Sequence, residues 1–115
     1  MGLEQSEVID FISMGKTTGQ VNLTIVDALD WMDENSHLIL LQDKVNAYLR
    51  FIENGELDLK YPKAVGRRRS INVVAQFEPT EAGFRLIQRI RDLIIDAGFN
   101  FQFTLRPDLA ILDES

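Results

Sequence analysis

Residues 21–55, VNLTIVDALDWMDENSHLILLQDKVNAYLRFIENG, determine how this chain folds. The stretch opens with apolar and polar residues that alternate over 21–25, which predicts a β-strand with one buried face. An acidic bend that contains Trp31 follows. We expect a long helix next, from about residue 36 to residue 54, ended by Gly55. The remainder of the chain therefore has to supply partners for one strand and one helix.

The helix carries both a start signal and a core-facing stripe. Asn35 or Ser36 is the expected N-cap, and Asp33 and Glu34 just before it complement the positive end of the helix dipole. One face repeats apolar residues at helical spacing: Leu38, Leu41, Val45, Tyr48, Leu49 and Ile52. This stripe predicts a helix that packs on the apolar face of a sheet.

The other segments predict three more strands and a second helix. Residues 8–14 form a short apolar run, which the glycine-flanked turn 15–19 joins to the strand at residue 21 as a hairpin. The connection 56–69 contains Pro62 and is expected to be irregular. The later elements are a strand over 71–78, a helix from Pro79 or Thr80 to Gly98, and a strand over 99–106 that includes Phe99, Phe101 and Phe103.

The element order ββαβαβ defines the expected fold class. Strands that are apolar on one face only need a single layer of helices, so we predict an α+β two-layer sandwich. Its sheet has four strands and is mixed, with the first two strands antiparallel and the last two parallel through a right-handed crossover. One domain spans 1–115, with a core at about 4–106 and a tail at 107–115. The order of the strands in the sheet cannot be read from this pattern.

Composition restricts the classes of function. The 115 residues include 12 Lys and Arg against 18 Asp and Glu, a net charge of −6, which argues against nucleic acid as a partner. Cysteine is absent, so thiolate metal sites and cysteine nucleophiles are excluded. No signal peptide or run of about 20 apolar residues is present, so we expect a cytoplasmic protein without a membrane partner. We expect no cofactor either.

Three segments resemble a known family: LTIVDALDW at 23–31, HLILLQDKVNAYLRFIENGEL at 37–57 and YPKAVGR at 61–67. They are similar to small bacterial proteins that are grouped only as a domain of unknown function, and the resemblance runs from about Glu4 to Arg106. It implies a stand-alone bacterial protein of one domain. It implies no catalytic residue and no ligand.

The acidic bend, residues 27–37, is the first candidate for chemistry. Asp27, Asp30, Asp33, Glu34 and His37 offer oxygens and one imidazole, which are ligands that divalent cations accept. Their spacing lacks the turn glycine and terminal glutamate of a calcium-binding EF-hand. In the alternative interpretation, the aspartates bond local backbone groups and the helix end.

Two further groups of residues are candidates for binding: one lies in or next to the bend, and the other lies after the long helix. We expect His37, the only histidine, to be solvated, and Trp31 to close one end of the sandwich or to anchor an interface. Basic residues gather in the long connection: Lys60, Lys63, Arg67, Arg68 and Arg69. They suit a solvated loop, an acidic protein partner or, less well, nucleic acid.

A second stripe on the long helix is the candidate interface. Leu40, Ala47 and Phe51, with Lys44 beside them, fall roughly opposite the core stripe. Apolar side chains on the back of a helix predict a contact surface, here with a second copy in antiparallel pairing. In the other interpretation, the chain covers them itself, with its tail or with the 56–69 connection.

The sequence therefore favours a non-enzymatic interaction module, bound to itself or to another protein. The alternative is a small enzyme or divalent-metal protein that uses the acidic bend, and a nucleic-acid binder that uses the basic connection ranks third. No glycine-rich phosphate loop supports an enzyme: at Gly15-Lys16-Thr17, Asp10 stands where glycine is required, and a strand follows instead of a helix.

Overall fold

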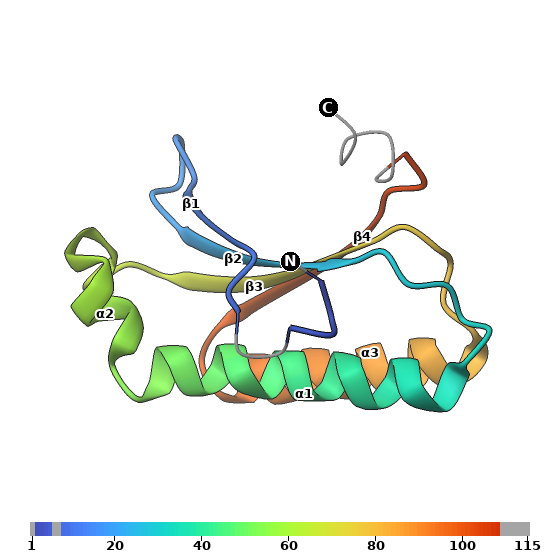
Figure 1. The fold of residues 1–115 in the computed structure, drawn as a ribbon. Coiled ribbons are helices and arrows are strands. Elements are labelled where there is room, and N and C mark those ends of the chain that lie inside the picture. Colours follow the sequence, from blue (N-terminus) through green and yellow to red (C-terminus); the bar gives the residue numbers. More distant parts are fainter. Residues whose placement is uncertain (1, 6–7, 109–115) are drawn as a thin grey trace.

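The computed structural model describes residues 2–5 and 8–108 and has one sheet with helices on one face only (Figure 1). The elements in chain order are β1 (Phe11–Met14), β2 (Val21–Asp27), α1 (Glu34–Glu53), α2 (Glu56–Lys60), the 3-10 turn η1 (Pro62–Ala64), β3 (Arg69–Ala75), α3 (Glu81–Asp96) and β4 (Asn100–Leu105). The predicted α+β sandwich, with a mixed four-stranded sheet and two long helices, is confirmed.

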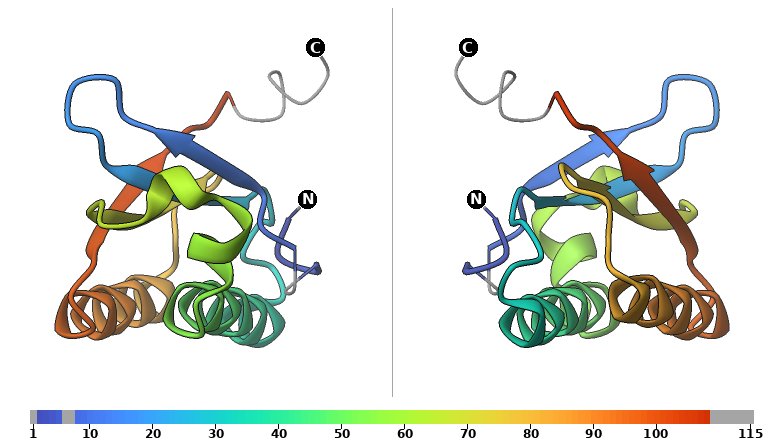
Figure 2. Two further views of the ribbon diagram at one scale, coloured as in Figure 1. Left: turned by 90° about the vertical axis from the view of Figure 1, so that its left-hand side faces the viewer. Right: turned by 90° about the vertical axis from the view of Figure 1, so that its right-hand side faces the viewer.

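The strands lie in the sheet in chain order, β1-β2-β3-β4. The first pair is antiparallel, and the other two pairs are parallel. The parallel pairs need crossover connections, which α1 and α3 provide. Seen end-on, the two long helices form one layer and the sheet the other, with β4 and α3 at one flank and the N-terminal segment at the opposite flank (Figure 2).

The strand register explains why only one face needs a cover. Leu23, Ile71 and Phe101 share one row across three strands, and Ile25 and Val73 share the next. Side chains alternate between faces, so these apolar rows all meet the helices. The opposite face carries mainly amides and hydroxyls, as the sequence alternation predicts.

Both long helices end at the expected glycines but begin at caps that are only partly as predicted. Asp33 caps α1 by accepting from Ser36 N at 3.3 Å, so the cap is neither Asn35 nor Ser36. Thr80 caps α3, which confirms one of the two predicted starts of this helix. Gly55, with φ of 87°, follows α1 in a left-handed conformation that a side chain would strain.

Two sequence expectations about connections are wrong. The 56–69 segment is not irregular, because α2 and η1 occupy much of it: Leu57 and Ala64 are buried, and Pro62 begins a turn in which its missing N–H costs nothing. Phe77, which the predicted strand over 71–78 includes with its side chain on the same face as Ile71 and Val73, lies beyond the end of β3 and is exposed. Most of the predicted tail, residues 109–115, lies outside the described residues.

The N-terminal segment is held against α1 by a buried lysine. Lys44 Nζ donates to the carbonyl oxygens of Gly2 and Gln5, each at 2.8 Å, and to Asp10 Oδ1 at 2.9 Å. Neither side chain of the Lys44–Asp10 pair has any solvent-exposed surface. All three donors of the ammonium are thus satisfied, which is the condition under which a buried charge is tolerated.

Asp10 extends this network into the sheet. Its Oδ2 accepts from Val26 N at 2.9 Å, and its own N–H donates to the Tyr48 hydroxyl at 2.8 Å. That hydroxyl in turn donates to the carbonyl oxygen of Thr24 at 2.8 Å. Burial raises the pKa of Tyr48, which keeps the phenol protonated and able to donate. The network therefore links β2, α1 and the N-terminal segment.

We predict that Lys44→Met destabilises the protein by about 3–5 kcal/mol, because it leaves the Asp10 carboxylate buried without its cation. Denaturant unfolding measures the loss. The matched control is Lys63→Met, which removes an exposed lysine and should change stability by less than about 0.5 kcal/mol. Similar losses in the two variants would show that the buried pair is not a structural requirement.

Candidate functional site

The candidate interface on α1 is not an exposed stripe. Lys44, Ala47 and Phe51 are buried, and Leu40 is half-buried. We expected these residues to be an exposed surface for the helix of a second copy. That expectation is wrong, because the chain itself already covers them. Phe51 belongs to the hydrophobic core.

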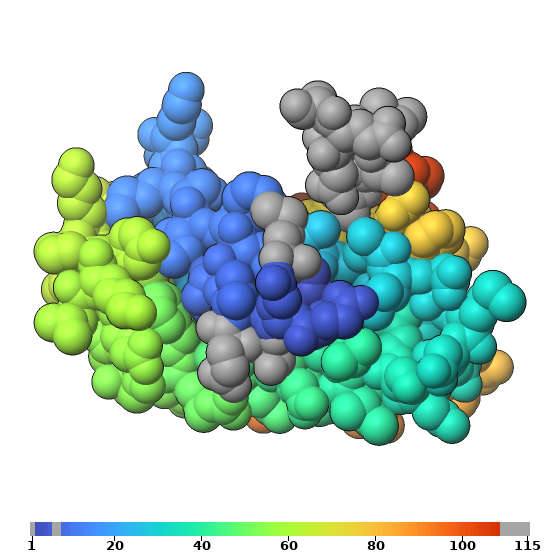
Figure 3. All heavy atoms as spheres, in the orientation of Figure 1, coloured from blue at the N-terminus to red at the C-terminus, as the bar shows by residue number. Residues whose placement is uncertain are grey.

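The cover comes mainly from a segment that the sequence interpretation did not consider. Residues 2–5 and 8–10 lie over α1, with Leu3 buried in the core, and Figure 3 shows them against the helix. The 56–69 connection contributes as well, because Lys60 Nζ lies 5.7 Å from the centre of the Phe51 ring. Intramolecular cover is thus the correct one of the two interpretations.

The acidic bend is built around a buried contact between Asp27 and His37. The Nε2 atom of His37 lies 2.6 Å from Asp27 Oδ2, and its Nδ1 atom lies 2.8 Å from the carbonyl oxygen of Asp30. The histidine ring is buried rather than solvated, so that expectation is wrong. Both ring nitrogens are occupied by protein groups, which leaves neither free to bind a metal or to transfer a proton to a substrate.

The partners of His37 define its protonation. A carbonyl oxygen only accepts, so Nδ1 carries a proton, and an ionised Asp27 requires a second proton on Nε2. Burial lowers the pKa of His37, but the hydrogen bond and charge of Asp27 and the contacts with Asp30 outweigh it, and the net pKa is raised above 6.5. The raised pKa therefore favours the imidazolium form of His37, whose two N–H groups match the two oxygen acceptors.

Trp31 closes this end of the sandwich, as one of its two interpretations predicted. Its ring stacks on His37, with the ring centres 3.6 Å apart and the planes 14° from parallel. It also lies against α3 at Gly83, where a Cβ atom would come within 2.8 Å of the indole. Glycine at this helix position is thus required by the close approach of the tryptophan.

Asp27 and Asp30 also accept from the local backbone, as the second interpretation of the bend predicted. Asp30 Oδ1 accepts from Met32 N at 3.1 Å, and Asp27 Oδ1 accepts from Leu29 N at 3.2 Å. A small hollow of about 210 Å³ lies beside the bend. Within residues 2–5 and 8–108, no group of three or more acidic or histidine side chains is placed to hold a metal ion.

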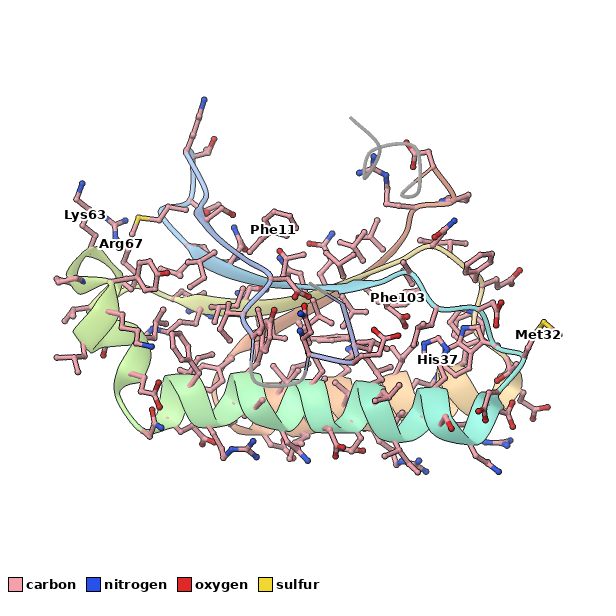
Figure 4. The ribbon with its side chains drawn as sticks, viewed as in Figure 1. Phe11, Met32, His37, Lys63, Arg67 and Phe103 are labelled. Carbon is pink, nitrogen blue, oxygen red and sulfur yellow. The ribbon has the colours of Figure 1, made fainter. Side chains whose placement is uncertain are left out.

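The basic connection is partly structural. Arg67 donates to the carbonyl oxygens of Lys63 and Gly19, which ties the connection to the β1–β2 hairpin, while Arg69 pairs with Asp58. Arg68 and Lys63 are exposed. Lys63 and Arg67 lie at one end of the molecule and His37 at the other (Figure 4). The two groups of predicted partner-binding residues therefore do not form one site.

The surface that the sequence interpretation missed is the outer edge of β4 and the adjoining side of α3. Arg106 N donates to Ala75 O, so the backbone groups of residues 101, 103 and 105 point away from β3. Among the described residues, β4 pairs with β3 alone. A hollow of about 480 Å³ runs along this edge. Its lining consists of Ile87, Gln88, Arg91, Ile95 and residues 100–103. We call these residues and the open backbone the β4 edge surface.

The β4 edge surface is apolar and carries no charge on its strand. Phe101 and Phe103 are half-buried, Ile95 and Phe84 are more than one-third exposed, and the sequence 99–105, FNFQFTL, contains no charged residue or proline. Natural proteins usually protect an edge strand with such residues. The opposite edge is the shorter strand β1, which has four residues.

Only part of this surface had a signal in the sequence. The alternation over 99–106 predicted a strand with phenylalanines on one face, but the position of that strand at the sheet edge depends on strand order. Ile87 follows the apolar spacing of a helix, whereas Gln88 and Arg91 are polar residues of a kind common on any helix surface. The site is therefore defined by the position of β4 at the edge of the sheet, which residue types alone do not indicate.

The structure defines a protein of the two-layer α+β class with a one-sided mixed sheet, whose β4 edge is unpaired among the described residues. The chain belongs to DUF6572, a family of unknown function whose model matches residues 1–107. No curated protein and no solved structure matches it. Within the described residues, every helix is too short or too polar to cross a membrane.

We predict that the Asp27–His37 pair makes stability depend on pH. Because the folded-state pKa of His37 is raised, its contribution is complete below about pH 6.5 and is lost as the pH rises through the folded-state value. Denaturant unfolding between about pH 6 and pH 9 measures the decline, and NMR titration of the single histidine gives the pKa directly.

Asp27→Asn is the control for this pH dependence. The amide can accept from or donate to a neutral His37 but cannot hold an imidazolium by charge, so the pKa of His37 should fall and the alkaline loss of stability should disappear. A wild-type protein whose stability is flat across this range, or a variant with the same decline, would contradict the assignment of charge to the pair.

Proposed function

We propose that the protein is a non-enzymatic interaction module that binds another polypeptide at the β4 edge surface. The observation that carries the proposal is the edge of β4, which is uncharged and, among the described residues, unpaired, beside a mainly apolar hollow. An extended segment placed there forms backbone hydrogen bonds with residues 101, 103 and 105, and its side chains enter the hollow beside Ile95. This is recognition by strand addition.

The distribution of reactive side chains favours this function over catalysis at the acidic bend. His37 has both nitrogens engaged, Asp27 is buried against it, and the Lys44 ammonium has three acceptors. These groups are the ones that chemistry at neutral pH most often requires, and each one is committed to holding the fold. Among the described residues, the apolar edge of β4 has no such internal partner.

The expected setting and partners belong to the same proposal. The family resemblance supports a bacterial protein, and a chain without cysteine suits the reducing cytoplasm. A second copy of the chain and a different protein both fit an edge that offers mainly backbone groups. Nucleic acid is disfavoured because Arg67 and Arg69 are engaged by the protein and the net charge is −6.

We predict selective binding of extended peptides at the edge. A displayed library of random linear 12-residue peptides, selected on the immobilised protein, should yield sequences with alternating apolar residues. Two-dimensional NMR should place the bound peptide at the amides of Phe101, Phe103 and Leu105, whose N–H groups face the open edge.

Two variants on α3 make this test specific. Ile95→Lys changes a lining residue of the hollow, whereas Leu93→Lys changes an equally exposed leucine that does not line it. Ile95→Lys should weaken peptide binding at least about tenfold and Leu93→Lys should change it little. Equal effects, or no peptide enriched above an unrelated protein, would refute strand addition at this surface.

We also predict no binding to a labelled 20-base DNA or RNA, single-stranded or duplex, in fluorescence anisotropy at about 0.15 M salt. Binding that falls steeply with added salt and is lost in the triple variant Arg67→Ala, Arg68→Ala, Arg69→Ala would instead make the basic connection the working surface.

A further inference from the structure

We propose that the partner at the β4 edge surface is a second copy of this chain, joined to the first through antiparallel pairing of two β4 strands. The inference rests on the proposed function, since it names the polypeptide that the edge binds. It predicts one continuous eight-stranded sheet with a two-fold axis at its centre. The two α3 helices then lie side by side beneath the joined strands.

The strand itself is self-complementary in one register. The residues with outward backbone groups are 101, 103 and 105, and in an antiparallel pair such residues must face each other to exchange both hydrogen bonds. Placing Phe101 opposite Phe103 of the second copy meets this requirement twice, once on each side of the axis. Gln102 then faces its own copy on the outer face of the sheet.

This register also matches side chains by type. The helix-facing side brings phenylalanine against phenylalanine, an aromatic cross-strand pair that stabilises antiparallel sheets. The outer side brings Gln102 against Gln102 and Asn100 against Thr104, all neutral and polar. No charge is buried anywhere along the joined strands. A partner of different sequence would have to reproduce this neutral pattern, which the chain already contains.

The helices have the spacing that such a dimer needs. Within one chain, two long helices cover four strands, so each helix covers about two strands, or roughly 10 Å of sheet. Packed helices lie about 8–10 Å apart. Adding a second sheet at β4 places the second α3 at the same interval beyond the first. In the proposed dimer the helical layer thus continues from one copy to the next.

The exposed side of α3 is self-complementary about a point between Arg89 and Ile90. In antiparallel packing about that point, Phe84 meets Ile95 of the second copy, and Gln88 meets Arg91 of the second copy. Phe84 and Ile95 are among the exposed apolar residues of the monomer. The polar pair joins an amide oxygen to a guanidinium, and the two arginines are kept apart.

The test is sedimentation equilibrium of the full chain from about 1 to 300 µM, with variants of exposed residues that leave the monomer fold intact. Gln102→Lys places two like charges directly opposite each other and should weaken the dimer at least about tenfold. Ser13→Lys adds the same charge to the exposed outer face of β1, at the other edge, and should leave the dimer within about threefold.

A second pair of variants tests the helix contact by gain as well as loss. Gln88→Glu places a carboxylate opposite Arg91 of the second copy and should tighten the dimer by about 2- to 30-fold, the range that two exposed ion pairs contribute. Gln88→Lys should weaken it. Amide hydrogen exchange should slow at Phe101 and Phe103 as the concentration rises.

The outcomes separate this inference from the proposed function. A monomer throughout the concentration range, or a dimer sensitive to Ser13→Lys but not to Gln102→Lys, overturns the second copy as partner. If that monomer still binds selected peptides at β4, the interaction module stands without the dimer. Edge amides that are protected in a monomer, and lose protection when residues 109–115 are removed, would make the chain's own C-terminal segment the occupant and overturn the inference.

Discussion

The buried contact between Lys44 and Asp10 is the constraint on which the arrangement of this protein depends. An ammonium group without solvent contact must find three acceptors, and two of them are carbonyl oxygens of the N-terminal segment. Satisfying Lys44 therefore brings residues 2–5 and 8–10 across α1 and buries Leu3 beneath them. The same requirement explains why the apolar second stripe of α1 is already covered by the chain. At the opposite flank, no described residue covers the outer edge of β4.

Sequence patterns predicted the layers of this fold because both periodicities are strong. The alternation over 21–25 and 99–106 and the apolar repeat of α1 identified the sheet face and the helix face that meet. Strand order could not be predicted, because neighbouring strands are chosen by tertiary contacts rather than by local pattern. Nor could the burial of Lys44, since two of its three acceptors are backbone oxygens more than 30 positions away, and backbone groups have no signature in a sequence.

The candidate sites show the same division. The role of Asp27 and Asp30 in local backbone contacts was an available interpretation, because aspartates after a strand commonly make such bonds. His37 was misplaced because the first turn of a helix is usually solvated. Its burial depends on Trp31, which stacks on the ring from the side that water would otherwise occupy, and on Gly83, which lets the indole approach α3. Three residues distant in sequence thus create an environment that none of them indicates alone.

The chain-order sheet has a consequence for how the protein is synthesised. Each strand pairs with the strand that precedes it in the sequence, so no later segment has to be inserted between two strands already joined. Each pairing therefore closes only the one connection between consecutive strands, with 48 positions between paired residues of β2 and β3 and 30 between those of β3 and β4. On the ribosome, the hairpin, α1 with β3, and α3 with β4 emerge in the sequence in which they assemble. Asp10 is the exception, because its carboxylate stays hydrated until α1 has formed and Lys44 can pair with it. The N-terminal flank is therefore completed only after a later helix has been synthesised.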